Sequence, residues 1–92
     1  MNNEQSNLEI DILQLKTIEQ LPLNLLLLAD PSEEQVMKYA STGECYVAVT
    51  NDEEIVGVYV LIQLDERTAE IMNVAVSEHM QGKGLGKKLV LH

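Results

Sequence analysis

The sequence predicts a single α/β domain of the α+β type, in which a mostly antiparallel sheet is packed with a few helices. Residues 55–64 and 68–76 are rich in β-branched residues and lie one short turn apart, which favours antiparallel neighbours. Residues 21–42 have helical composition and typical helix-boundary residues. A polar, glycine-rich loop at residues 77–86 then leads into residues 87–91, which are predicted to begin another helix.

The first half of the chain is predicted to contain one strand and two helices. Residues 8–15 mostly alternate apolar with polar side chains, the period of a strand with one buried face. The Leu-rich segment 21–29 favours a short helix. Residues 30–35 supply a capping side chain, a proline and acids for a second helix, which ends at Gly43. Residues 1–7 are polar and are predicted to be disordered.

The second half is predicted to contain three consecutive strands. Residues 45–49, 55–64 and 68–76 form them, separated by polar turns at 51–54 and 65–66. Their long apolar runs without alternation favour a sheet that is covered on both faces. The predicted order is therefore strand, two helices, three strands and the start of a helix.

Composition is that of a soluble globular protein, with 46% apolar and 23% charged residues. The apolar segment 23–29 is too short to cross a bilayer, and the first residues lack the pattern of a secretory signal. The only cysteine, Cys45, excludes an internal disulfide and a thiolate metal site. We therefore expect a cytoplasmic protein without a membrane partner.

Charge is distributed unevenly along the chain. The net charge of −9 argues against a nucleic-acid partner, because phosphate contacts need clustered Lys and Arg. Residues 1–80 contain all fifteen acids and three bases, a charge of −12, whereas residues 81–92 contain three lysines and no acid. This pattern indicates an anion site around the glycine cluster, on an otherwise acidic surface.

A strand, a glycine-rich turn and a helix start form a typical anion-binding arrangement, because the backbone N–H groups are free and the helix dipole favours negative charge. Two nucleotide-loop patterns fail at residues 81–88. The Walker A pattern would need Gly at Gln81 and Ser or Thr at Lys88. The dinucleotide pattern would need Gly at Lys87 and a βαβ unit before it.

The pattern that fits is [Arg/Gln]-x-x-Gly-x-[Gly/Ala], filled by Gln81, Gly84 and Gly86. It follows a strand that ends in Asn-Val-Ala-Val at 73–76. With this context and the order of elements before it, the sequence resembles the GNAT superfamily of acetyl-CoA-dependent N-acetyltransferases from Leu8 onward. An ordinary helix start with a tight glycine turn is the structural alternative.

The resemblance implies that acetyl-CoA is the co-substrate and that no metal takes part. It implies that main-chain groups of the strand end Val74-Ala75-Val76 pair with the pantetheine arm. The pyrophosphate would be held by the amides of the loop Gln81, Gly82, Lys83, Gly84, Leu85, Gly86 and Lys87.

The resemblance also implies that residues 1–92 are the N-terminal part of a single GNAT domain, without its C-terminal half. In the family that half supplies the other wall of the coenzyme cleft and a tyrosine that protonates the leaving thiolate. We therefore expect these 92 residues alone to be inactive.

Attack on a thioester needs a neutral amine, and alkylamines titrate at about 10.4, so a positioned base or a desolvating site must help at neutral pH. Glu70 is the one acid inside an apolar strand, and in the histone acetyltransferase branch of the family a catalytic glutamate lies at this offset inside a similar Ala-Glu-Ile, so the resemblance implies that Glu70 is the catalytic base. The alternative is that Glu70 pairs with a neighbouring side chain or only faces the cleft. We expect it to be buried, which would raise its pKa. His79 is better interpreted as a surface residue and Cys45 as a buried thiol.

The favoured function is transfer of acetyl to a small-molecule or peptide amine, and the acidic surface would attract cationic acceptors. The alternative is a non-catalytic acyl-CoA sensor or protein-interaction module, and a homodimer remains open. Tyr39 and Tyr46 fit a substrate pocket or core packing. Asn73 fits either substrate orientation or local bonding.

Overall fold

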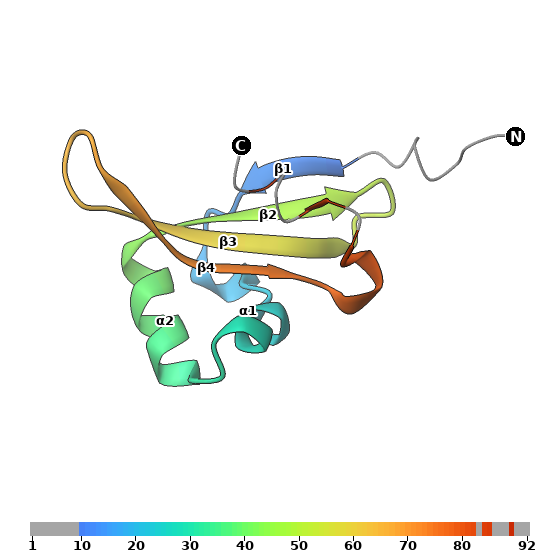
Figure 1. Cartoon of the computed structure of the whole chain (residues 1–92), viewed down its shortest axis with the longest axis horizontal. Helices are drawn as coiled ribbons and strands as arrows, with labels where there is room; N and C mark the ends of the chain where they lie inside the picture. Colours follow the sequence, from blue (N-terminus) through green and yellow to red (C-terminus); the bar gives the residue numbers. More distant parts are fainter. Residues whose placement is uncertain (1–9, 83, 86–88, 90–92) are drawn as a thin grey trace, which may run out of the picture.

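Four antiparallel strands and two α-helices make up the fold in a computed structural model that describes residues 10–82, 84, 85 and 89. The strands are β1 (Ile10–Gln14), β2 (Glu44–Thr50), β3 (Ile55–Gln63) and β4 (Ala69–Val76), and they lie side by side in the order β1-β2-β3-β4. The helices α1 (Leu23–Ala29) and α2 (Glu33–Thr42) lie together on one face of this sheet (Figure 1). The predicted fold class and order of elements are confirmed.

The boundaries of α2 follow directly from two residues, one at each end. Ser32 caps its start, where its hydroxyl oxygen accepts a hydrogen bond from the Gln35 amide at 3.3 Å. Gly43 ends it at a position where a Cβ would be only 2.5 Å from the Leu61 carbonyl oxygen. The α1 helix begins two residues later than predicted, because Pro22 occupies the position before its first turn.

The sheet is covered on both faces, as the apolar runs predicted. The helix-side core is formed by Leu26, Val36, Tyr39, Cys45, Val47, Val58, Val60 and Ala75. The loop-side core, on the opposite face, is formed by Ala48, Val56, Tyr59, Met80, Leu85 and Leu89. Burial of apolar side chains on both faces stabilises the sheet by roughly 25 cal/mol per Å².

Gly57, in the middle of β3, allows the segment after the glycine loop to lie on the sheet. A Cβ at this position would be 2.9 Å from the Leu89 Cδ1 atom and 3.4 Å from the Leu85 Cδ2 atom. Both leucines are buried and helical, which agrees with the predicted start of a helix for Leu89, whereas Leu85 lies in the segment predicted to be a loop. The glycine therefore sets how closely this segment approaches β3.

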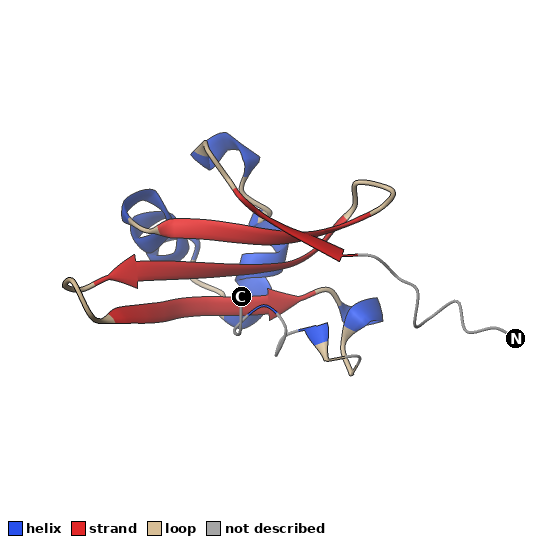
Figure 2. Cartoon of the chain, turned by 90° about the horizontal axis from the view of Figure 1, so that it is seen from above, coloured by secondary structure: helices blue, strands red, loops and turns tan. Residues whose placement is uncertain are grey.

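Two 3-10 helices were not predicted, at Ile18–Gln20 and Glu78–Met80. The second lies within the predicted loop 77–86 and directs Met80 into the loop-side core, where it is 7% exposed. It lies at the same end of the sheet as the turn between β2 and β3, as both overall views show (Figures 1 and 2). The prediction of disorder for residues 1–7 lies outside the described residues.

Candidate functional site

The outer edge of β4 presents main-chain groups that do not pair with β3. The Ser77 amide donates a hydrogen bond to the Val56 carbonyl at 2.9 Å. In an antiparallel ladder, alternate residues direct their N–H and C=O groups toward the partner strand. Because the register pairs Val76 with Gly57, both Val76 and Val74 direct these groups away from β3. These are the two residues predicted to pair with the pantetheine arm.

A β-bulge interrupts β4 two residues before Val74. Asn73 lies opposite Val60 and Ile71 lies opposite Leu61, so Met72 has no direct partner on β3. Bulges bend a strand locally and are over-represented next to active sites. The outer edge of β4 therefore changes direction at Met72.

Two glycines of the loop adopt a conformation that other residues rarely take. Gly82 has φ 83° and Gly84 has φ 81°, and a Cβ at either position would meet no atom of the described residues within 4 Å, apart from those of its chain neighbours. The loop backbone is thus left-handed at two alternate positions and open on the side where a side chain would stand. Successive N–H groups in such a turn make a concavity suited to an anion.

Gln81 joins the loop to the strand. Its side-chain Nε2 donates a hydrogen bond to the outward Val76 carbonyl at 3.0 Å. This contact shows that the Val76 carbonyl is accessible from the outer edge of β4. It also keeps the first residue of the glycine loop next to the strand end.

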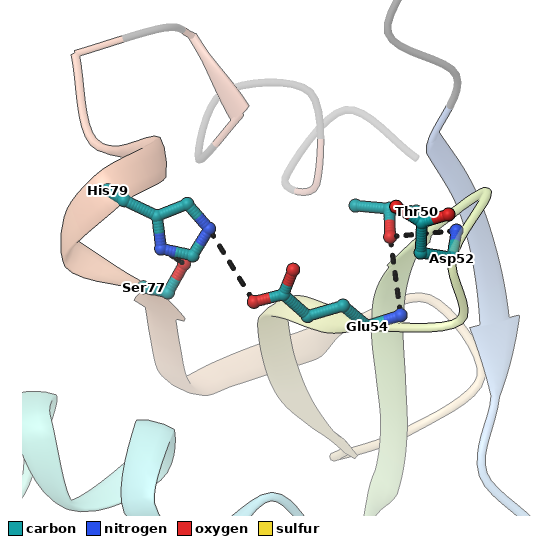
Figure 3. A network of polar contacts seen from close by, with 5 residues as sticks. All are labelled: Thr50, Asp52, Glu54, Ser77 and His79. Atoms are coloured by element: carbon teal, nitrogen blue, oxygen red, sulfur yellow. Dashed lines mark hydrogen bonds and ion pairs between the residues drawn. The ribbon is translucent and has the colours of Figure 1, made fainter.

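A polar network beside the loop joins it to the turn between β2 and β3 (Figure 3). The His79 Nε2 atom lies 3.6 Å from a Glu54 carboxylate oxygen, and the Ser77 hydroxyl lies 3.3 Å from His79 Nδ1. Thr50 Oγ1 accepts hydrogen bonds from the Asp52 and Glu54 amides at 3.3 and 3.2 Å. The side chains of His79 and Glu54 are each 57% exposed, in agreement with a surface histidine.

The structure brings together the described members of the predicted coenzyme site. The outer edge of β4 at Val74 and Val76 runs into the loop, while Ala75 is buried in the helix-side core. The Leu85 side chain is buried in the loop-side core and so anchors the loop to the sheet. The predictions for Lys83, Gly86 and Lys87 lie outside the described residues.

The expected burial of Glu70 is wrong. Its side chain is exposed, as are its neighbours Ala69 and Ile71. In the described part of the chain this end of β4 pairs only with β3. Glu70 lies directly opposite Ile62, which packs against the helix-side core. Residues in such a pair point to the same face, so the Glu70 side chain lies on the helix side of the sheet.

Asn73 is buried and joins three elements by long-range contacts rather than by local bonding, while a role in orienting the substrate stays a prediction. Its Nδ2 donates to the Leu26 carbonyl at 3.1 Å and to the Tyr39 hydroxyl at 2.8 Å. Tyr39 in turn donates to Asp30 at 3.1 Å, and burial raises the Tyr39 pKa. Within the described part of the chain, the Asn73 Oδ1 atom is buried without a hydrogen-bond partner. Sequence reasoning missed this network because its members are 34 and 47 residues apart.

Cys45 is a buried thiol, as expected. It is 6% exposed, and burial raises its pKa to about 11, so the neutral thiol is the stable form at neutral pH. Among the described residues there is no group of three His, Cys, Asp or Glu that could hold a metal. The described helices also include none long and apolar enough to cross a membrane.

The outward strand edge and the open glycine loop together define a site for an extended ligand that carries an anionic group. Comparison with known proteins identifies the class more closely, since residues 13–92 match the model of the acetyltransferase (GNAT) family. The chain belongs to the GNAT family of acetyltransferases.

Similar proteins include an uncharacterized N-acetyltransferase, YvbK, from Bacillus subtilis, 54% identical over 68 residues. That match covers 74% of the chain and 43% of YvbK. An IAA acetyltransferase from Bacillus cereus superposes with a TM-score of 0.83 at 49% identity, covering 91% of the chain and 55% of that structure. A GNAT acetyltransferase from Elizabethkingia anophelis with acetyl-CoA bound superposes with a TM-score of 0.82 at 44% identity, covering 89% and 53%. The chain thus spans about half the length of these relatives.

Proposed function

We propose that the chain contributes the coenzyme-binding part of an N-acetyltransferase that transfers acetyl from acetyl-CoA to a primary amine in the cytoplasm. The observation that carries the proposal is the continuity between two outward strand residues, Val74 and Val76, and the open glycine loop. The arm of the coenzyme would pair with the strand edge, and its pyrophosphate would bind at Gly82 and Gly84. The relative that has acetyl-CoA bound supports this assignment.

The proposed reaction is direct attack without an acyl-enzyme. The amine nitrogen forms a bond to the acetyl carbon while the carbon–sulfur bond of the thioester breaks and coenzyme A leaves. Glu70, exposed on the helix side of β4, accepts the proton that the amine loses. The transfer requires an amine, a thioester and a base, and the proposal includes no metal. The acidic net charge opposes a nucleic-acid substrate.

Replacing Glu70 by Gln tests the base, because the amide keeps the shape and loses the proton-accepting charge. In the full-length protein we expect kcat to fall by about 100-fold or more, the range of general-base catalysis, while the affinity for acetyl-CoA stays the same. Release of free coenzyme A measures turnover, and calorimetry measures binding. Glu66→Gln, at an exposed glutamate in the turn after β3, is the matched control and should leave both unchanged.

Turnover of Glu70→Gln equal to that of wild type would remove Glu70 from the proposal. Tight acetyl-CoA binding with no transfer to any member of an amine panel would instead favour a non-catalytic acyl-CoA sensor. Failure to bind acetyl-CoA would overturn the coenzyme site itself.

A further inference from the structure

A groove of about 260 Å³ lies on the helix side of the sheet, between α2 and the first half of β4. Its lining residues are Gln35, Lys38, Tyr39, Thr42, Ile62 and Met72. The inner walls are apolar, formed by the Tyr39 ring, Ile62 and Met72, whereas Gln35, Lys38 and Thr42 belong to the exposed surface of α2. The groove therefore combines an apolar interior with a polar rim.

The groove shares its strand wall with the β-bulge and with Glu70. Met72, the bulged residue of β4, lines the groove. Ile62, which also lines it, lies directly opposite Glu70, and residues in such a pair point to the same face with Cβ atoms about 4.5–5.5 Å apart. An exposed carboxylate thus stands at the β4 end of an apolar groove.

The proposed path of the coenzyme ends at the same place. Its pyrophosphate would bind at the loop that follows Val76, so the arm runs back along β4 past Val76 and then Val74. Each strand residue advances about 3.4 Å, and the next position along that edge is the bulge at Met72. The thioester end of the arm therefore comes beside the opening of the groove.

We propose, on the basis of the function proposed above, that this groove selects the acceptor: a primary monoamine with a compact apolar substituent. An apolar cavity of about 150 Å³ holds benzene, so the groove can hold a phenyl ring and a short linker. The amine end lies toward Glu70. The Lys38 ammonium on the rim repels a second positive charge, which makes diamines and polyamines poor acceptors. The local arrangement thus opposes the preference for cationic acceptors expected from the net charge.

The charge part of the proposal is tested with the full-length protein, using 2-phenylethylamine and 1,5-diaminopentane as acceptors. We expect kcat/KM for the phenyl amine to exceed that for the diamine by about tenfold or more, since a hydrophobic contact alone discriminates by this amount. Lys38→Glu should raise kcat/KM for the diamine several-fold. Lys16→Glu makes the same charge change at an exposed lysine outside the groove and should alter neither value.

The apolar part is tested by Met72→Ala, which removes one wall of the groove. We expect KM for 2-phenylethylamine to rise by about tenfold while kcat changes little, the pattern of lost uniform binding. Met37→Ala is a matched control, because Met37 and Met72 are both 36% exposed and only Met72 lines the groove. Thermal unfolding of both variants establishes that they fold alike.

The outcomes separate this proposal from the one on which it rests. Acetyl transfer that favours the diamine, or a KM for the phenyl amine that Met72→Ala leaves unchanged, would overturn the groove as acceptor site and leave N-acetyltransferase activity in place. Bound acetyl-CoA with no transfer to either amine would overturn the transferase proposal, and the acceptor groove with it.

Discussion

At the scale of single residues, the glycine loop depends on two positions whose backbone is left-handed. Gly82 and Gly84 have φ near 80°, where a residue with a Cβ is destabilised by about 1–2 kcal/mol. In the part of the chain that the structure describes, no atom outside the adjacent residues lies within 4 Å of the position that a Cβ would take at either glycine. The requirement for glycine is therefore one of backbone conformation, not of space within the protein.

Gly82→Ala should weaken acetyl-CoA binding with little effect on folding. Because no described residue beyond the chain neighbours lies within 4 Å of a Cβ placed at residue 82, the loop can release the strain by changing its backbone, and the amides then leave the orientation that binds the pyrophosphate. We expect about a tenfold rise in Kd by calorimetry, which is about 1.4 kcal/mol. Gly82→Asn is the control, since Asn tolerates positive φ better than Ala and should retain more affinity. Equal affinities for wild type and Gly82→Ala would contradict this account.

Residue-scale predictions from sequence succeeded where the physics is local. The start of α2 after a capping side chain within residues 30–35 and its end at Gly43 were predictable, because each depends on residues within about one helical turn. The exposure of Glu70 was not predictable from the sequence, since it depends on which elements cover β4. Nor was the role of Asn73, whose partners Leu26 and Tyr39 come from distant helices.

At the scale of elements, two glycines control how closely the elements on either face approach the sheet. Gly43 lies at the end of α2 against the Leu61 carbonyl, on the helix side. Gly57 lies in β3 under Leu85 and Leu89, on the loop side. Both permit a close approach, but the groups that a Cβ would meet differ in how easily they move.

Gly43→Ala should destabilise the protein more than Gly57→Ala. The new Cβ at 43 would lie 2.5 Å from a backbone oxygen, so α2 or β3 must shift, whereas the Cβ at 57 would lie 2.9 Å from the end of the flexible Leu89 side chain. We expect a loss of about 1–3 kcal/mol in free energy of unfolding for Gly43→Ala, the range for overpacked sites, and a smaller loss for Gly57→Ala. Urea denaturation measures both. A larger loss for Gly57→Ala would show that the segment at Leu89 is the more rigid neighbour.

The arrangement of elements was largely predictable, because the strands β2, β3 and β4 follow one another across short turns and pair as antiparallel neighbours. What could not be predicted was the bulge at Met72 and the groove beside it. Both depend on the register between two strands and on the position of α2 over them. The residue types along one strand specify neither the register with its neighbour nor the position of a helix over the sheet.

At the scale of the whole molecule, two electrostatic effects act on an anionic coenzyme in opposite directions. The net charge of −9 repels it over long distances. Residues 81–92, with three lysines and no acid, attract it at short range. Acids also stand close to the loop, since Glu54 lies 3.6 Å from His79. Which effect dominates depends on the ionic strength, because salt screens distant charges before it screens contacts.

The rate of acetyl-CoA association should therefore pass through a maximum as salt is added. The Debye length is about 30 Å at 0.01 M and about 8 Å at 0.15 M, so the first additions remove the repulsion by distant acids and leave the loop contacts in place. Higher salt then weakens the contacts with the loop lysines, and the rate falls. Stopped-flow measurements on the full-length protein would test this, with acetyl-pantetheine, which lacks the phosphates, as the control whose rate should hardly change. A rate for acetyl-CoA that only decreases from the lowest salt onward would show that attraction by the loop outweighs the net charge at every distance.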